Sequence, residues 1–232
     1  MTSAPPSRAF DVRHVQLARA AFAAIAAVMI TFSSDHSAVV GMSVFSGFAI
    51  ATGLVHLLAA WLVYPAGLRW PSLLLAIVTL GAGMAGGIAP LRTVTGFFVV
   101  VIVWAALGGV IEGIAGVRAL RGDRSAAVPG RVAPWTDGTP ASVMPRTDAR
   151  DAVVIGGLGV VLALALLCIQ PGYALAYAVE DVQGTLTDII IAVGVFGGYA
   201  AIVAVYLGIA GFSPRTPLAP ADEAVAETKD HA

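Results

Sequence analysis

TVTGFFVVVIVWAALGGVIEGIAGV, residues 93–117, is an apolar run that contains one charged residue, Glu112. The hydrocarbon core of a bilayer is roughly 30 Å thick, so a helix that crosses it needs about 20 mostly apolar residues. The run is long enough for one crossing, and it lacks the polar alternation of a barrel strand. It therefore predicts a transmembrane helix.

Five further apolar runs extend this prediction to the whole chain. Hydrophobic residues make up 58% of the sequence and charged residues 12%, with a mean hydropathy of +0.88. A soluble protein of 232 residues needs a charged surface that this composition does not supply. We therefore expect an all-α, polytopic membrane protein with six transmembrane helices, arranged as three helical hairpins. The predicted spans are residues 15–33, 39–64, 70–88, 93–117, 152–169 and 186–212.

The first predicted span leaves one alternative open. Its uncharged core, residues 20–32, has the length of the apolar region of a cleaved signal peptide. A retained helix is favoured because Arg19 can extend its side chain toward the interface and let the span begin earlier. The segment before it also contains Pro5 and Pro6, which are untypical of a signal peptide.

The basic residues predict the orientation. With six spans, the two termini, the loop near Arg69 and the loop after the fourth span lie on one side of the membrane. Every Lys and Arg except Arg92 belongs to that side. Lys and Arg concentrate in cytoplasmic loops. The sequence therefore predicts a multi-pass protein of the inner (plasma) membrane with both termini in the cytoplasm.

Three segments outside the spans are predicted to be cytoplasmic. Residues 1–14 lead into the first span, residues 118–151 link the fourth and fifth spans, and residues 213–232 form a tail. The linker, mainly residues 122–150, and the tail are rich in Pro and small or polar residues. They hold too few large apolar side chains to offset the entropy of ordering, so both are predicted to be disordered. The alternative for the linker is a docking site for a cytoplasmic partner around Trp135.

The hairpins contain an internal repeat. In the first two, an aromatic residue precedes a glycine by five positions and a polar residue follows the glycine by three. Internal repeats normally place helices around a pseudo-symmetry axis. We therefore treat residues 15–117 as two hairpin repeats and residues 152–212 as the third. The matched residues are Phe48, Gly53 and His56, then Trp104, Gly109 and Glu112, then Phe196, Ala201 and Ala204.

Short patterns of glycine, an aromatic residue and proline also mark individual spans. The third span contains LLLAIVTLGAG, residues 73–83, and ends near Pro90. The fourth contains WAALGGVIEGI, residues 104–114, and runs on into two arginines. The fifth ends at Gln170 and Pro171.

On these patterns the chain resembles the HdeD-type acid-resistance membrane proteins. The resemblance covers residues 15–212 and is strongest over residues 69–121. It departs from the family at the long loop after the fourth span and at the acidic stretch of residues 177–188. The resemblance implies six helices and a non-enzymatic role in envelope stress or acid tolerance. It implies no catalytic residues.

Glu112 is the leading candidate for a functional residue. An ionisable side chain inside a spanning helix is energetically costly and indicates a functional site by default. Glu112 is therefore a candidate proton-responsive residue, with a structural hydrogen bond as the alternative. His56 lies at the equivalent position of the repeat, and histidine changes its charge near neutral pH. A Glu112–His56 contact would form a pH-sensing pair, whereas a hydrogen bond from His56 to a carbonyl is the structural alternative.

A polar group precedes the last predicted span. Asp188 lies near its start, close to Gln183, Thr185 and Thr187. We expect Thr185 to cap the helix and Asp188 to supply the negative charge that favours a first helical turn. The alternative is that these residues line an entrance on the external side.

Glycine pairs predict close helix packing. Two glycines four positions apart share one helix face and let two backbones approach each other. We expect tight packing within one chain, with homo-oligomerisation as the alternative. The pairs are Gly83 with Gly87, Gly109 with Gly113, and Gly194 with Gly198.

No sequence motif indicates a cofactor, metal or nucleic-acid partner. Cys168 is the single cysteine, the four histidines show no ligand spacing, and no phosphate-binding loop or nucleophile elbow is present. The net charge of −1 argues against nucleic acid. The expected function is that of a non-enzymatic protein whose main partner is the lipid bilayer. Two alternatives stay open: a membrane subunit or scaffold of a larger complex, and a small transporter or channel that uses Glu112.

Overall fold

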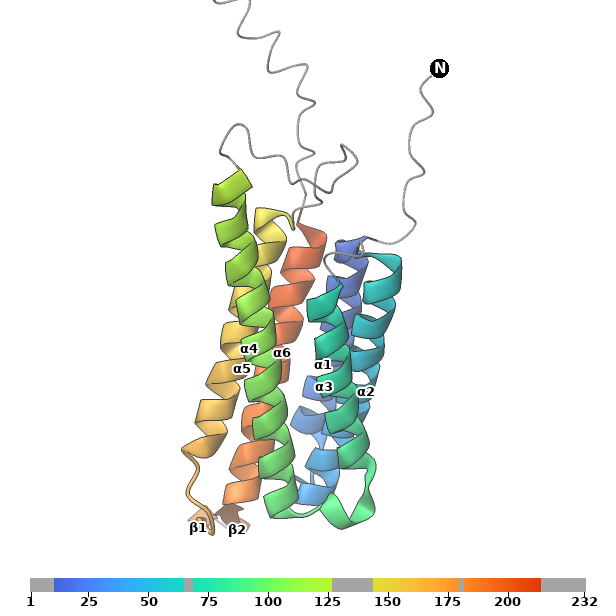
Figure 1. Cartoon of the computed structure of the whole chain (residues 1–232). Coiled ribbons are helices and arrows are strands. Elements are labelled where there is room, and N and C mark those ends of the chain that lie inside the picture. Colours follow the sequence, from blue (N-terminus) through green and yellow to red (C-terminus); the bar gives the residue numbers. More distant parts are fainter. Residues whose placement is uncertain (1–10, 65–68, 127–143, 180–181, 214–232) are drawn as a thin grey trace, which may run out of the picture.

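The computed structural model describes residues 11–64, 69–126, 144–179 and 182–213. Within these ranges six long helices form one antiparallel bundle (Figure 1). Each has a segment long and apolar enough to cross a membrane, which confirms the predicted all-α polytopic fold. The helices are α1 (Val12–Phe32), α2 (Ala38–Leu62), α3 (Trp70–Gly87), α4 (Val94–Ala126), α5 (Arg146–Leu167) and α6 (Asp188–Phe212).

Polar residues mark where the first helices begin. The Asp11 side chain accepts a hydrogen bond from the His14 backbone N–H, and His14 Nδ1 accepts one from the Asp11 backbone N–H, so the two residues form a capping box. Ser37 caps α2 through Val40 N. Because α1 ends at Phe32 and Ser37 caps α2, only a short turn connects these two antiparallel helices.

The six helices form a closed ring. Each helix packs against the next in the chain, and α6 returns to α1. The most extensive contacts join α4 to α5, α1 to α6 and α2 to α3. The tightest pairs are therefore not the three sequence hairpins, although each hairpin occupies a consecutive part of the ring. We call the end of the bundle where α1 begins and α6 ends the terminal end.

The outer surface of the ring is apolar, and so is most of its interior. Large side chains on the outside are well exposed, including Phe32 at 82% and Trp61 at 75%. An apolar surface of this extent indicates contact with lipid. Inside, aromatic rings pack edge to face in the half of the bundle away from the terminal end, with ring centroids 5.2–5.8 Å apart. They are Phe45, Phe48, Trp104 and Phe196.

Gly83, Gly109 and Gly113 lie at close helix contacts. A Cβ added to Gly109 would lie 2.7 Å from the carbonyl oxygen of Gly156 on α5, and one added to Gly156 would lie 2.8 Å from Gly113 Cα. A Cβ on Gly83 would lie 2.9 Å from the backbone nitrogen of Ile50 on α2. Glycine is therefore required at positions 83, 109 and 156, whereas a Cβ added to Gly113 itself would meet no atom within 4 Å. Gly87 makes only an ordinary contact, with Ser46 Oγ at 3.8 Å from an added Cβ.

The packing prediction for Gly194 and Gly198 is wrong. Both face outward, and an added Cβ would meet no atom within 4 Å. The close contacts of α6 with α1 lie at Gly197, against Ile30, and at Gly211, against Leu17. Glycine spacing indicates that two residues share a face, but it does not indicate whether that face turns toward another helix.

Several boundaries differ from the sequence prediction. The helix α4 continues to Ala126 and α5 begins at Arg146, so both ends of the predicted 118–151 linker are helical. Residues 127–143, which include Trp135, lie outside the described residues. The same holds for residues 1–10 of the predicted leading segment and for residues 214–232 of the predicted tail.

A short β-hairpin joins α5 to α6 and was not predicted. Strand β1 (Ala174–Val179) pairs antiparallel with β2 (Val182–Thr187), and Ala174 lies opposite Thr187. Thr185 therefore lies in a strand, and its predicted role as the helix cap is wrong. Asp188 is in the first turn of α6, as expected, where its carboxylate accepts hydrogen bonds from Ile189 N at 2.7 Å and Gly172 N at 2.8 Å.

Candidate functional site

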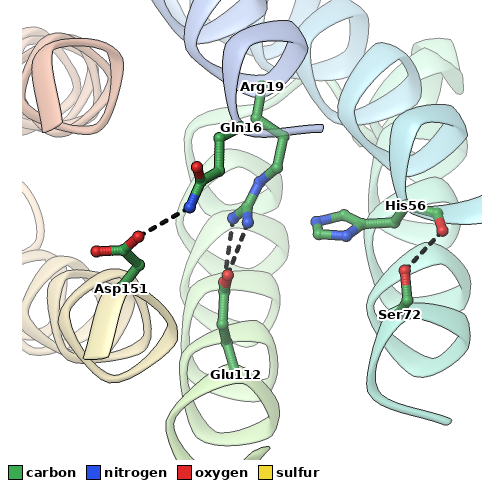
Figure 2. A network of polar contacts seen from close by, with 6 residues as sticks. All are labelled: Gln16, Arg19, His56, Ser72, Glu112 and Asp151. Carbon is green, nitrogen blue, oxygen red and sulfur yellow. Dashed lines mark hydrogen bonds and ion pairs between the residues drawn. The ribbon is translucent and has the colours of Figure 1, made fainter. Parts of the chain in front are cut away.

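A charged pair lies inside the bundle. Arg19 on α1 donates two hydrogen bonds to Glu112 on α4, from Nη1 to Oε1 at 2.7 Å and from Nη2 to Oε2 at 3.1 Å (Figure 2). The two side chains are only 14% and 12% exposed. Such a bidentate arrangement fixes both side chains and is stronger than a neutral hydrogen bond. Arg19 lies seven residues after the start of α1, which is about 10 Å along the helix.

Asp151 forms a second polar contact closer to the terminal end. Its carboxylate accepts a hydrogen bond from Gln16 Nε2 at 2.8 Å and another from the Tyr206 hydroxyl at 2.9 Å. Asp151 therefore connects α5 to both α1 and α6. Asp148, one turn earlier on α5, is 5% exposed and lies beside this group.

His56 lies near the ion pair but does not pair with Glu112 through a hydrogen bond. Its imidazole on α2 points toward the guanidinium of Arg19 (Figure 2) and is buried. Its backbone carbonyl accepts a hydrogen bond from Ser72 Oγ on α3 at 2.7 Å. The structure thus brings Glu112 and His56 to the same place, as the repeat suggests, while Arg19 provides the partner of Glu112.

Every helix of the ring contributes to this polar group. The contributions come from the half of the bundle nearer the terminal end, because α1, α3 and α5 supply residues near their starts, α2 and α6 supply residues near their ends, and Glu112 lies just past the middle of α4. The residues are Arg19, His56, Ser72, Glu112, Asp151 and Tyr206. We call them, together with Gln16, the central polar site.

Two small cavities lie on either side of the ion pair. The outer one, of about 60 Å³, is nearer the terminal end, and the inner one, of about 30 Å³, lies deeper. A cavity needs about 10–15 Å³ to hold a water molecule, so each has room for water. Arg19, His56 and Glu112 line both cavities. The outer cavity also contacts Gln16, Asp148 and Asp151, and the inner one Thr52, Trp104 and Tyr199.

Two buried polar atoms face this space without a protein partner. Within the part of the chain that the structure describes, Arg19 Nε and Thr52 Oγ1 make no hydrogen bond. Buried polar atoms normally bind a partner, and an atom that borders a cavity is available to a water molecule or a small ion. Each cavity therefore offers polar groups to water and is large enough to hold it, although most of its lining is apolar.

The site is closed on its inner side. Trp104 Nε1 donates a hydrogen bond to Thr79 Oγ1 at 3.2 Å, which fixes the indole beside the inner cavity. Phe45 and Phe48 pack on the same indole. The outer cavity instead reaches Val12 and Tyr64 at the terminal end. Among the described residues, the cavities of the central polar site therefore extend furthest toward the surface at the terminal end.

Sequence reasoning missed the partner of Glu112 and the neighbouring residue Asp151. It treated Arg19 as a residue whose side chain reaches the interface, and it placed Asp151 in the linker. The sequence did contain one indication of the pair, because Arg19, like Glu112, is a charged residue within a predicted span. Asp188 lies at the opposite end of the bundle, beside the β-hairpin, so it does not belong to the site. Among the described residues no group of three His, Cys, Asp or Glu side chains has the geometry of a metal site.

Replacing Tyr206 by Phe tests the outer part of the site. The change removes the hydroxyl that donates to Asp151 and leaves the ring in place. We expect the free energy of unfolding to fall by about 1 kcal/mol, because Gln16 still donates to the same carboxylate. Unfolding in detergent by sodium dodecyl sulfate, followed by tryptophan fluorescence, measures the change. Equal stability of the two proteins would show that water replaces the hydroxyl without loss.

Comparison of the chain with protein-family models, curated proteins and solved structures gave no match. The likeness to HdeD-type proteins therefore rests on the short sequence patterns alone. The function is accordingly inferred from the geometry of the central polar site.

Proposed function

We propose that this protein is a small, non-enzymatic membrane transporter or channel for protons, with Glu112 as the group that takes up and releases the proton. The observation that carries the proposal is the buried Arg19–Glu112 pair between two cavities that can hold water. A carboxylate between hydrated spaces, in a bundle that is otherwise apolar, is the arrangement of a proton relay.

The size of the cavities favours protons over organic solutes. Sites for drug-sized ligands have volumes of about 300–1,000 Å³. The two cavities here measure about 60 and 30 Å³. They accommodate a few water molecules, and a chain of waters is sufficient to carry a proton from the terminal end to Glu112.

The ion pair links protonation to helix movement. Glu112 faces Arg19 on α1, His56 on α2 and Tyr199 on α6 across the cavities. A proton on Glu112 removes the negative charge that Arg19 needs, and an unpaired charge inside a bundle is costly. Protonation therefore favours a rearrangement of α1 against α4, which would open the inner cavity toward the other side of the membrane.

The physiological role that we propose is acid tolerance at the inner membrane, as the resemblance to HdeD-type proteins implies. The basic terminal end would face the cytoplasm, so the outer cavity would exchange protons with the cytoplasm. A role as the membrane subunit or scaffold of a larger complex stays a prediction.

Proton flux in proteoliposomes tests the proposal. We expect the wild type to dissipate an imposed pH gradient, reported by a pH-sensitive dye in the lumen. The double variant Arg19→Gln/Glu112→Gln removes both charges without leaving one unpaired, and its flux should fall by about 100-fold or to the leak of protein-free liposomes. Gly198→Ala, on an open outer face, should conduct like the wild type.

Two results separate the parts of the proposal. Equal flux through the double variant and the wild type would exclude Glu112 as the proton carrier. Flux by the wild type without any loss of acid survival in a deletion strain would contradict the acid-tolerance role alone.

A further inference from the structure

A groove runs along the outer surface between α4 and α5. Its volume is about 550 Å³, and Val117 and Val153 are among its apolar walls. Gly113 and Gly157 form part of its floor, and a Cβ added to either would meet no atom within 4 Å. The bundle therefore leaves this space open, although it packs α4 and α5 against each other elsewhere.

Two arginines line the groove at the terminal end. Arg118 and Arg121 are both exposed. The Arg118 guanidinium lies over the Trp70 ring, 5.7 Å from its centroid, which holds the charge beside an aromatic residue of the kind found at membrane interfaces. Among the described residues no carboxylate forms an ion pair with either arginine.

The length of the groove matches one leaflet of a bilayer. From Gly109 at its deep end to Arg118 is nine residues, or about 14 Å of helix at 1.5 Å per residue. One leaflet contributes half of the roughly 30 Å hydrocarbon core. The arginines therefore lie at the level of the lipid headgroups, and the glycine floor extends toward the middle of the membrane.

We propose that the groove binds one anionic phospholipid. An acyl chain lies over Gly113 and Gly157, and the lipid phosphate binds Arg118 and Arg121. The occupant is a lipid because the groove is apolar along one leaflet, and it is anionic because the charged end carries two arginines that form no ion pair with any described residue. The leaflet is the one at the terminal end, which the charge distribution predicts to be cytoplasmic. This inference does not depend on proton transport.

Native mass spectrometry of the full chain tests the site. The protein is equilibrated with equal amounts of phosphatidylglycerol and phosphatidylcholine, and the lipid retained on the protein is identified. Two arginines at headgroup level should give about a 30-fold preference for phosphatidylglycerol. Arg118→Gln/Arg121→Gln should lose the preference, and Gly157→Leu should lose the bound lipid because its side chain occupies the groove.

Gly198→Leu is the matched control. This glycine also lies on an open outer face, but on α6 and away from the groove, so the variant should retain phosphatidylglycerol like the wild type. Equal retention of both lipids by the wild type, or undiminished retention by Gly157→Leu, would overturn the proposal. A dimer that Gly157→Leu abolishes would also overturn it, because the groove would then hold a second copy of the chain.

Discussion

Replacing Glu112 by Gln is expected to lower the free energy of unfolding by about 3 kcal/mol, the lower end of the range for breaking a buried ion pair. The variant leaves the Arg19 guanidinium inside the bundle with a neutral neighbour in place of its carboxylate. The lower end applies because the adjacent cavities admit water to the charge. Sodium dodecyl sulfate titration with tryptophan fluorescence measures the loss.

A double-mutant cycle shows whether the loss comes from the unpaired charge. Arg19→Gln alone should also be destabilising, because it leaves the Glu112 carboxylate buried without its partner. The double variant Arg19→Gln/Glu112→Gln should be more stable than the Glu112→Gln variant by about 2 kcal/mol, since it holds no unpaired charge. A Glu112→Gln variant as stable as the wild type would contradict the prediction and show that the pair is fully hydrated in the folded protein.

The free-energy cost of burying charges also bears on why the Arg19–Glu112 ion pair is present. A buried ion pair is often no more stabilising than well-packed apolar side chains of similar volume. The interior around Phe45 and Phe196 shows that this bundle packs well without charges. The presence of Arg19 and Glu112 therefore supports the proposal that this pair takes part in proton movement, because stability alone does not require it.

The fold was largely predictable because the length of an apolar run can be read directly from the sequence. Composition and run length were sufficient to identify six spans, and the described part of the chain contains six long helices in those places. The start of α5 was missed because Arg146, Asp148 and Asp151 resemble a loop in sequence. The helix continues through them, and Gln16 and Tyr206 provide partners for Asp151.

The candidate site was predictable only in part. Glu112 and His56 were identified from their type and from the repeat, and both line the same cavities. Arg19 was assigned to the interface because the sequence does not reveal which helix face turns toward the centre of the ring. The third hairpin lacks a polar residue at Ala204, but it contributes Asp151 and Tyr206 from other positions.

The second large loss of stability is expected from a substitution at Gly156 on α5. We expect Gly156→Ala to lower the free energy of unfolding by more than about 2 kcal/mol, because overpacking a close contact is destabilising. The new Cβ would lie 2.5 Å from Gly113 N and 2.7 Å from Gly109 O. Both are backbone atoms, so the clash can be relieved only by moving α4 away from α5. The same detergent unfolding titration measures the loss.

Gly157→Ala is the control for this prediction. It adds the same methyl group one residue later, where nothing lies within 4 Å, so its stability should equal that of the wild type or exceed it by up to about 1 kcal/mol through better helix propensity. Equal stability of the two variants would mean that α4 and α5 do not approach each other as closely as described. A loss confined to Gly156→Ala would show that the contact between α4 and α5, which also positions Glu112 and Asp151, requires a glycine at position 156.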